Sequence, residues 1–315
     1  MKNNMVKKLL TLALAGAMTL SLAACGSKSD DSSNDAQQGG DESGKTYKVA
    51  IIKQLDHASL DEIANAVATE LDKIAADNNV TIEYDITSGQ NDQTILKQLS
   101  DQAIADQVDA IIPIATTAAQ ISALSAEDTK TPVVYAAVSD PEAASLTGID
   151  YVTGTSDALP VEAQLKLIRA LMPDATKIGI LHTTSETNSD ATLALYKELA
   201  PNYGFEIIDK GISTGADLPM ALDALLPQVD CTTNLTDNTV VSYLAVVLEK
   251  SEEYGKPVFG SEIEQVINGC VASEGIEYTE LGRQTGRMAA RVLRGESAED
   301  IPYETISNSY LYVNP

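Results

Sequence analysis

The sequence predicts an α/β protein built from two doubly wound, Rossmann-like lobes, each with a parallel sheet, joined by a hinge. Two observations lead to this prediction. From Tyr47 onward, short β-rich runs alternate with amphipathic helical runs, which is the order of a parallel sheet covered by helices on both faces. The same order then repeats, so each half holds about five strands, which fits two lobes better than one very wide sheet.

The first half begins with the strand "YKVAIIK". Ser59, with Glu62 three residues later, forms the pattern of a capping box and predicts the start of the first helix. Strands and helices then alternate up to residue 138. We expect strands at residues 47–53, 80–87, 108–115 and 131–138, and helices at 59–77, 91–106 and 116–127.

The second half opens with the small polar stretch "VTGTSDA" and repeats the architecture without an obvious repeat of sequence. Its last helix precedes "PYETISNSYLYVN", which predicts one or two terminal strands. We assign residues 47–152 with about 275–300 to an N-terminal lobe, and 153–274 with about 301–315 to a C-terminal lobe. We expect helices at residues 160–172, 189–200, 216–226, 239–254 and 279–295, and strands at 176–182, 205–212, 230–235, 256–260 and 269–276.

The N-terminus predicts export. Residues 1–24 combine three lysines with an apolar run of about 16 residues, shorter than the ~20 that span a bilayer, which is typical of a signal peptide. Leu22-Ala23-Ala24 and Cys25 resemble the lipobox of bacterial lipoproteins, which implies that Cys25 is lipidated and begins the mature chain. Residues 25–46 are almost wholly polar and predict a flexible tether. We therefore expect an extracytoplasmic protein anchored to the membrane by lipid.

Composition argues against several other classes of protein. A net charge of −25 disfavours binding of the folded part to nucleic acid. Cys231 and Cys270 are expected on separate strands, as free buried thiols. The only histidines, His57 and His182, show no clustered spacing, so no metal site is expected. There is no G-x-S-x-G elbow and no phosphate-binding glycine loop, so we expect neither catalytic residues nor a cofactor.

Clusters of small polar residues follow several predicted strands, at the ends where ligands bind in an open parallel sheet. Such residues also cap helices, at about 1 kcal/mol each, so any one cluster can be a cap. One cap needs one side chain, however, and "GTSD", "SETNSD" and "LTDN" supply more. The excess favours a small zwitterion, with its carboxylate at helix N-termini and its ammonium group beside Asp157 or Asp237. The clusters are Thr116 and Thr117, Thr155 to Asp157, Ser185 to Ser189, and Thr236 to Thr239.

Four longer segments resemble a known family. "GIDYVTGTSDALPVEAQLKLIRALMPDATKIGILHTTSETNS", "TDNTVVSYL", "GKPVFGSE" and "GIEYTELGRQTGRMAARVLRGE" are similar to substrate-binding proteins of bacterial ABC transporters in the tryptophan/tyrosine family. The likeness runs from about Tyr47 to the C-terminus and implies a type I periplasmic binding protein, whose two lobes close over a ligand, often an aromatic amino acid. Two features depart from the family: Thr155 replaces a small apolar residue, and cysteines 231 and 270 replace alanine-like residues.

The resemblance also implies which residues bind the ligand. The family's "SD", "NS" and "TDN" motifs fall on positions 156–157, 188–189 and 236–238, and "QLDHASLDE" matches its first-strand loop. His57 alone can equally be a structural group. Tyr151 and Tyr278 suit hinge packing as well as the wall of a pocket for a ring. The expected ligand-binding residues are Gln54, His57, Thr116, Thr117, Thr155, Ser156, Asp157, Asn188, Ser189, Asp237 and Asn238.

The implied function is that of a monomeric solute-binding lipoprotein that captures an aromatic amino acid, Tyr, Trp or Phe, between two lobes and delivers it to an ABC permease. No chemistry on the ligand is required, so we do not expect an enzyme. The alternative is a surface interaction protein, an adhesin or a ligand sensor, which would use the same fold and anchor. The absence of Trp lowers the expectation for sugars, which many binding proteins stack on Trp.

Overall fold

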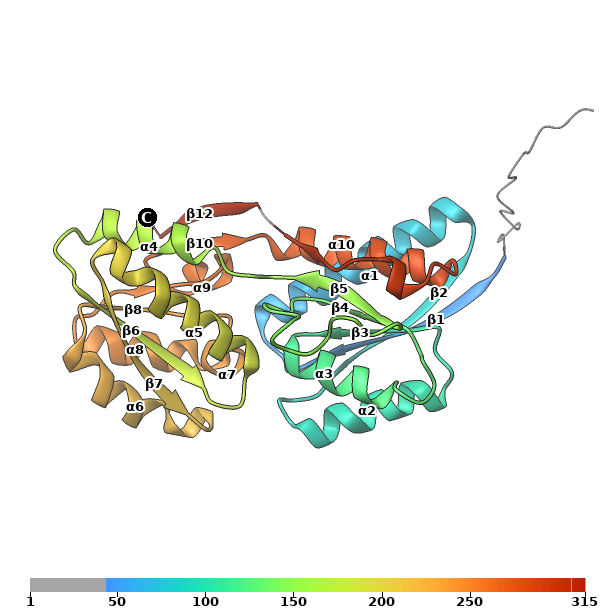
Figure 1. Ribbon diagram of the computed structural model, residues 1–315, viewed down its shortest axis with the longest axis horizontal. Coiled ribbons are helices and arrows are strands. Elements are labelled where there is room, and N and C mark those ends of the chain that lie inside the picture. Colours follow the sequence, from blue (N-terminus) through green and yellow to red (C-terminus); the bar gives the residue numbers. More distant parts are fainter. Residues whose placement is uncertain (1–43, 307, 315) are drawn as a thin grey trace, which may run out of the picture. The chain divides into compact units, whose positions relative to one another are not determined.

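The structure, a computed structural model, describes residues 44–306 and 308–314 (Figure 1). These residues belong to the compact unit Asp41–Pro315. The predicted signal peptide at 1–24, the predicted lipidation site at Cys25 and most of the predicted tether at 25–46 lie outside the described residues. The first strand starts at Thr46, one residue before the predicted start.

Six parallel strands form the first sheet, in the order β11-β5-β4-β3-β1-β2. Every residue of β3, "AIIPI", is buried, as expected for a strand covered on both faces. This continuous apolar run is why the segment could be recognised as a strand. The strands are β1 (Thr46–Lys53), β2 (Thr81–Ser88), β3 (Ala110–Ile114), β4 (Val133–Tyr135), β5 (Val152–Ser156) and β11 (Glu304–Thr305).

Helices cover both faces of this sheet (Figure 1). Helices α1 and α10 pack against each other on one face, and α2 packs against α3 on the other. The approach of α1 to α10 depends on Gly282, where an added Cβ would lie 2.6 Å from the Ala66 Cβ. The helices are α1 (Ala58–Asn78), α2 (Gln93–Ala105), α3 (Thr116–Ser125) and α10 (Tyr278–Leu293).

A second parallel sheet has the order β7-β6-β8-β9, and β10 pairs with β12 as an antiparallel ribbon. Helices α4 and α5 cover one face of the four-stranded sheet, and α6 and α8 cover the other. The strands are β6 (Lys177–Thr183), β7 (Glu206–Ile212), β8 (Cys231–Thr233), β9 (Val258–Phe259), β10 (Ala272–Ile276) and β12 (Ser309–Val313).

The helices of this second part differ from expectation at two places. The single helix expected at 239–254 is interrupted at Tyr243, whose ring packs so closely over Gly215 that a Cβ there would lie 2.1 Å from it. The five-residue helix α9 is too short to show a helical period in sequence. The helices are α4 (Val161–Leu171), α5 (Thr187–Leu199), α6 (Leu218–Leu225), α7 (Asn238–Ser242), α8 (Leu244–Glu253) and α9 (Ile263–Ile267).

We term the first sheet with α1, α2, α3 and α10 the N-terminal lobe, and the remaining sheets with α4 to α9 the C-terminal lobe. The chain passes between them after β5, after β10 and after β11. The lobe boundaries proposed from sequence, at 152 and about 301, shift accordingly. All of β5 pairs in the first sheet, and Glu304 pairs with Thr155, so residues 153–156 and 304–305 belong to the N-terminal lobe. A two-residue pairing such as that of β11 leaves no periodic signal in sequence.

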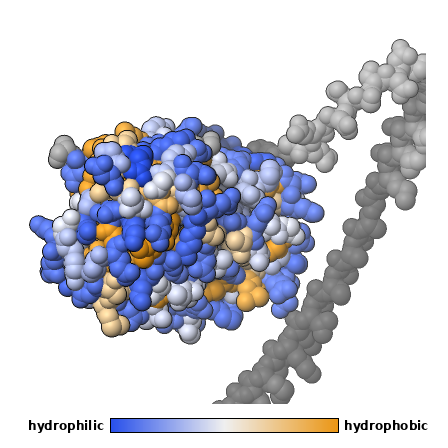
Figure 2. All heavy atoms as spheres, turned by 60° about the vertical axis from the view of Figure 1, so that its left-hand side comes forward, coloured by the Kyte–Doolittle hydropathy of each residue, from blue (hydrophilic) through white to orange (hydrophobic). Residues whose placement is uncertain are grey.

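The surface drawn in Figure 2 is mostly hydrophilic, with hydrophobic residues in separate patches. Within the described part of the chain, no helix is both long and apolar enough to cross a membrane.

The two cysteines of the folded part are free, buried thiols, as predicted. Cys231 begins β8, and Cys270 precedes β10. Burial raises the pKa of each thiol to about 12. Both are therefore poor nucleophiles while the protein stays folded.

Candidate ligand site between the lobes

A buried cavity lies between the two lobes. It is narrow, with about 20 Å³ open to the centre of a water molecule, which is little more than the space of one water. A larger ligand therefore requires the lobes to separate and close again around it. The cavity is lined by His57, Ser59, Leu60, Ala115, Thr116, Ala137, Ser139, Asp157, Asn188, Thr236, Asn238, Val241, Ser261, Glu262, Gln265 and Tyr278.

Asp157 contributes a carboxylate to the cavity from the end of β5. Ser139 Oγ donates a hydrogen bond to its Oδ1 at 2.9 Å, and Tyr278 Oη donates to its Oδ2 at 3.2 Å. Burial raises the pKa of Asp157, although both hydrogen bonds act to lower it. The groups that compensate this buried charge, two hydroxyls and the backbone N–H of Asp157 itself, are all neutral, so the carboxylate can still gain from a cationic partner.

Asn188 brings an unpaired acceptor to the cavity from the first turn of α5. Its Nδ2 donates to the Thr236 carbonyl oxygen at 2.9 Å and to Glu186 Oε2 at 3.3 Å. This orientation leaves the buried Asn188 Oδ1 without a hydrogen-bond partner among the described residues. An unsatisfied buried acceptor that lines a cavity is suited to a ligand N–H or O–H group.

Glu262 is a second carboxyl group in the cavity, at the end of the segment that follows β9. It caps α9 by accepting hydrogen bonds from the backbone N–H groups of Glu264 at 2.6 Å and Gln265 at 3.2 Å. Burial raises the pKa of Glu262 to about 7. Its charge therefore changes close to neutral pH, unlike that of an ordinary glutamate.

The start of α3 forms another part of the wall. Its N-cap residue, Ala115, has φ 80° and provides no side-chain cap, and Ala137, which lines the same cavity, has φ 57°. Such backbone conformations cost roughly 1–3 kcal/mol for a residue with a Cβ and concentrate at ligand sites. Thr116 lies at the first helical position, where Ala115 gives no side-chain cap and Gln54 Oε1 accepts from the Thr117 backbone N–H at 3.2 Å. The positive end of the helix dipole favours an anionic group there.

The cavity is acidic. Its titratable lining groups are His57, Asp157, Glu262 and Tyr278, and none of the lining residues that the structure describes is Lys or Arg. Leu60, Val241 and the two alanines add apolar wall. No group of three or more metal-binding side chains occurs within residues 44–306 and 308–314. The arrangement suits a ligand that carries a positive charge and some apolar surface.

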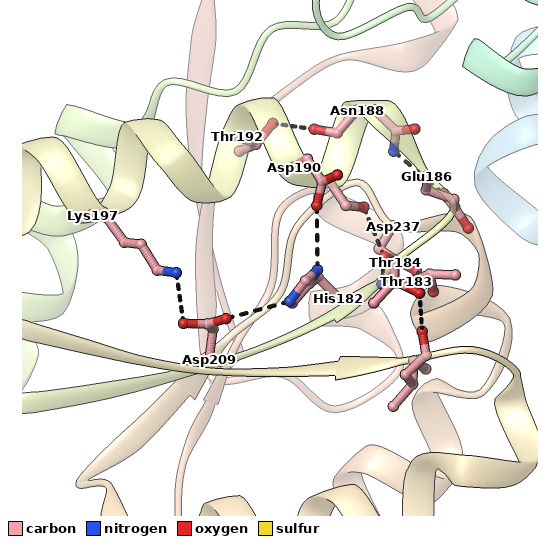
Figure 3. Close-up of polar contacts among 12 residues, drawn as sticks. His182, Thr183, Thr184, Glu186, Asn188, Asp190, Thr192, Lys197, Asp209 and Asp237 are labelled. Carbon is pink, nitrogen blue, oxygen red and sulfur yellow. Dashed lines mark hydrogen bonds and ion pairs between the residues drawn. The ribbon is translucent and has the colours of Figure 1, made fainter.

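Asp237 occupies a different environment from Asp157 and does not line the cavity. Thr183 donates to it from its backbone N–H at 2.5 Å and from Oγ1 at 2.8 Å. Ser189 Oγ donates at 2.7 Å and the Val240 backbone N–H at 2.9 Å. Figure 3 shows Asp237 beside Thr183. With four donors on its two oxygens, Asp237 joins the ends of β6, α5 and α7 and has no free capacity for a ligand ammonium group.

His57 serves both of the roles left open by the sequence. It is the N-cap of α1, accepting from the Leu60 backbone N–H through Nδ1 at 3.5 Å, and it lines the cavity. The capping box predicted at Ser59 and Glu62 is wrong, because α1 starts two residues earlier than that pattern requires. Glu62 instead accepts from the backbone N–H of Thr279 at 2.9 Å.

The structure separates the two tyrosines whose roles the sequence left undecided. Tyr151 packs within the N-terminal lobe, where its hydroxyl donates to the Ala123 carbonyl oxygen at 3.0 Å. Tyr278 lines the cavity and contacts Asp157.

The eleven residues expected from sequence to bind ligand fall into three groups. Five line the cavity: His57, Thr116, Asp157, Asn188 and Asn238. Gln54 and Thr117 line a second space, further out between the lobes. Four are buried within one lobe and line neither space: Thr155, Ser156, Ser189 and Asp237. Thr155, for example, shares a hydrogen bond of 2.8 Å with Thr285 of α10.

Sequence reasoning missed Ser139 and Glu262. Both follow strands that were predicted, Ser139 after β4 and Glu262 after β9. The rule that ligands bind beyond the carboxyl ends of parallel strands applies to them too, but each lies outside a cluster of polar residues.

Comparison with known proteins identifies the family. A family model described as ABC transporter substrate binding protein matches residues 48–315. A tyrosine-binding protein of Clostridioides difficile (strain R20291) is 31% identical over 313 residues, which cover 98% of this chain and 90% of that protein.

Two solved structures are similar as well. An ABC domain from Streptococcus pneumonia in complex with L-Trp has a TM-score of 0.80 at 29% identity, covering 85% of this chain and 92% of that one. The ligand-free, open structure of a substrate-binding protein with adhesive properties from Clostridium difficile has a TM-score of 0.63 at 32% identity and the same coverage. The chain belongs to the family of ABC transporter substrate-binding proteins and has the fold of type I periplasmic binding proteins.

Proposed function

We propose that the protein captures an aromatic amino acid in the cavity between its lobes and delivers it to an ABC permease. Substrate-binding proteins of this family act outside the cytoplasm, bind a small molecule and carry out no chemistry on it. The choice of an aromatic amino acid is supported by the relatives that bind tyrosine and L-Trp. Closure over the ligand would select the state in which both lobes contact it.

The observation that carries this proposal is the charge of the cavity. The carboxylate of Asp157 is buried and accepts hydrogen bonds from two neutral hydroxyl groups. Among the described residues, no Lys or Arg lines the cavity to balance its charge. The ligand ammonium group would pair with Asp157, and Asn188 Oδ1 would accept from a ligand N–H or O–H group. The ligand carboxylate would lie at the N-terminus of α3 beside Thr116, and the ring against the apolar wall.

A thermal-shift screen followed by titration tests the proposal. The chain from Gly26 onward contains the whole compact unit Asp41–Pro315 and would be tested against the twenty amino acids, common sugars and nucleosides. A ligand that binds only the folded state raises the melting temperature by mass action. The chain contains no Trp, so fluorescence of bound L-Trp can be followed without background. Shifts confined to Tyr, Trp or Phe are expected, whereas a shift only with a sugar or nucleoside would contradict the ligand class.

The matched control ligands are the aromatic amines and aromatic 2-oxo acids that share the same rings. If Asp157 pairs with the ammonium group, an oxo acid that lacks nitrogen should bind at least tenfold more weakly than the amino acid, because the buried charge stays unpaired. Equal affinity for the amino acid and the oxo acid would show that Asp157 does not pair with the ammonium group.

A second function, adhesion to a surface, is favoured by one comparison, since a similar Clostridium difficile protein is described as having adhesive properties. It would not exclude transport. Binding of the purified protein to epithelial cells, with and without saturating amino acid, separates the two functions. Cell binding without any small-molecule ligand would favour adhesion alone.

We further propose that Cys25 carries a lipid anchor and that the protein is a monomer. Replacing Cys25 with Ser in the full chain should release the protein from the membrane fraction and abolish incorporation of labelled palmitate. Sedimentation of the unlipidated chain checks the monomer, because a dimer would have twice the mass.

A further inference from the structure

Besides a hydrogen bond between Ser59 and Glu262, three side-chain hydrogen bonds between the lobes have their C-terminal-lobe partners on one segment, residues 236–239. Asn91 Nδ2 donates to Thr239 Oγ1 at 3.0 Å, and His57 Nε2 lies 3.4 Å from Asn238 Oδ1. The third pair is Ser139 Oγ and Thr236 Oγ1, at 3.0 Å. The orientation of this one segment therefore governs three of the contacts that hold the lobes together.

The Asn91 contact belongs to a chain of hydrogen bonds that runs in a single direction. The Thr117 backbone N–H, at the start of α3, donates to Gln54 Oε1 at 3.2 Å. Gln54 Nε2 then donates to Asn91 Oδ1 at 3.1 Å, which leaves Asn91 Nδ2 to cross to Thr239. Thr239 Oγ1 in turn donates to Glu186 Oε1 at 2.9 Å. The chain thus begins at a helix N-terminus and ends on a carboxylate.

The His57 contact belongs to a second chain with the same direction. The Leu60 backbone N–H donates to His57 Nδ1, so the ring proton is on Nε2 and points to Asn238 Oδ1. Asn238 Nδ2 donates to Glu186 Oε2 at 3.0 Å. Both chains therefore start at helix N-termini of the N-terminal lobe and end on the two oxygens of one buried side chain, Glu186.

A carboxylate can only accept hydrogen bonds. Glu186 accepts hydrogen bonds from the Asn238 amide NH₂ and from the Thr239 hydroxyl. Asn238 Oδ1 and the lone pairs of Thr239 Oγ1 are therefore left to accept from the N-terminal lobe. Glu186 also accepts from the backbone N–H groups of Asn238 at 2.9 Å and Thr239 at 3.0 Å, which fixes the segment itself. Burial and the nearby Asp237 raise the pKa of Glu186, which means that this environment disfavours the ionised carboxylate. The hydrogen bonds from Asn238 and Thr239 stabilise the ionised form against that penalty.

We propose that Glu186 is a positioning residue for lobe closure, which orients Asn238 and Thr239 as acceptors for His57 and Asn91. Glu186 lines the outer space between the lobes and not the ligand cavity, so its effect on a ligand in that cavity acts through closure. The inference rests on the proposed function only in that closure is taken to strengthen ligand binding.

The alternative is that Glu186 merely caps α7 within its own lobe. A double-mutant cycle distinguishes the two roles, with Glu186→Gln in the C-terminal lobe and Asn91→Ala in the N-terminal lobe. The glutamine places an NH₂ group against donors, so one of the two chains must break. Gln93→Ala is the matched control, because Gln93 lines the outer space between the lobes and its side-chain amide has no hydrogen bond within the described residues.

Binding of L-Trp and L-Tyr to the chain from Gly26 onward provides the first measurement. Asn91→Ala and Glu186→Gln should each weaken binding about three- to tenfold, the size of one or two hydrogen bonds. The double variant should bind more tightly than the product of the two effects predicts, because the Asn91 chain is lost only once. Fully additive effects, or no effect of Asn91→Ala, would overturn the proposal. If Glu186→Gln fails to fold, Thr239→Val takes its place in the cycle.

The second measurement needs no ligand, so it separates failure of this inference from failure of the proposed function. Labels on cysteines introduced at Leu124 of α3 and Met220 of α6, both highly exposed, report the distance between the lobes. Cys231 and Cys270 are buried and should not react. We expect a population of short distances in the parent chain and with Gln93→Ala, and its loss with Asn91→Ala or Glu186→Gln. A parent chain with only long distances would overturn the inference even if ligands bind.

Discussion

Asp157 and Asp237 are two buried aspartates that follow strands and look alike in sequence, yet the lobes use them differently. In the N-terminal lobe, Asp157 has two hydroxyl donors and faces the cavity. In the C-terminal lobe, Asp237 has four donors, two of them backbone N–H groups, and faces its own lobe. The difference teaches that burial does not identify a ligand-binding carboxylate, whereas the number of donors already committed to it does.

The largest expected effect is on stability at Asp237. Replacing Asp237 with Asn turns an NH₂ group toward donors and leaves backbone N–H groups unpaired, so the free energy of unfolding should fall by about 3–5 kcal/mol. Denaturant titration measures this change. Asp174→Asn, on an exposed loop, is the matched control and should change stability by less than about 0.5 kcal/mol. Equal stability of the two variants would show that the four hydrogen bonds contribute little.

Asp157→Asn should have the opposite profile. We expect affinity for the amino acid to fall about ten- to a hundredfold, because the ammonium group loses its charged partner. Stability without ligand should stay within about 1 kcal/mol or rise, since burial makes the charged form of Asp157 costly. Calorimetric titration and denaturation of the same sample measure both quantities. Unchanged affinity would assign Asp157 to the same structural role as Asp237.

Glu262, the second carboxyl group of the cavity beside Asp157, should make the stability of the protein depend on pH. Its pKa rises from 4.5 in the unfolded chain to about 7 when buried, so the folded state holds an extra proton between these values. The stabilising effect of that proton is present below pH 4.5 and is lost as the pH rises through about 7, by at most about 3 kcal/mol. Glu262→Gln cannot ionise, and an amide caps α9 less well. We expect it to gain about 1–2 kcal/mol relative to the parent chain between about pH 5 and about pH 8.

Denaturation of both chains across that pH range tests the expectation. If the parent chain and Glu262→Gln show the same pH dependence, Glu262 ionises as an ordinary exposed glutamate would, and the second carboxyl group of the cavity is not desolvated.

Ser139→Ala should have the smallest effect. It removes one donor from Asp157 and the contact with Thr236 of the other lobe. Loss of one hydrogen bond predicts affinity weakened about threefold, with stability changed by less than about 1 kcal/mol. Titration with L-Trp measures it. A loss as large as that of Asp157→Asn would mean that Ser139 contacts the ligand itself.

Much of the fold could be predicted from sequence, for local reasons. The apolar runs of β1 and β3 and the amphipathic patterns of α1 and α10 reflect which side chains are buried, and burial leaves a period in the sequence. The two-residue strand β11 and the break at Tyr243 could not be predicted, because they depend on contacts with residues far away in the chain.

The candidate site was predictable only in part. The rule about strand ends correctly brought Asp157, Asn188 and Asn238 to one cavity, since the carboxyl ends of parallel strands share an edge. The same rule could not tell that Ser189 and Asp237 bond to each other, at 2.7 Å, and so face away from it. Nor could it assign a role to Glu186, which lies within the polar cluster 185–189 but stands in the sequence as an ordinary helix-start residue.

By itself, the sequence determined the α/β class, the alternation of strands and helices, the free cysteines and the family. These features could be predicted because periodic burial and family motifs involve residues that are close together in the sequence. Only the tertiary structure decided which polar groups of each cluster face the ligand space. That choice depends on how many donors each buried oxygen meets once the lobes fold, and those donors come from segments that are far apart in sequence, such as β6, α5 and α7 around Asp237.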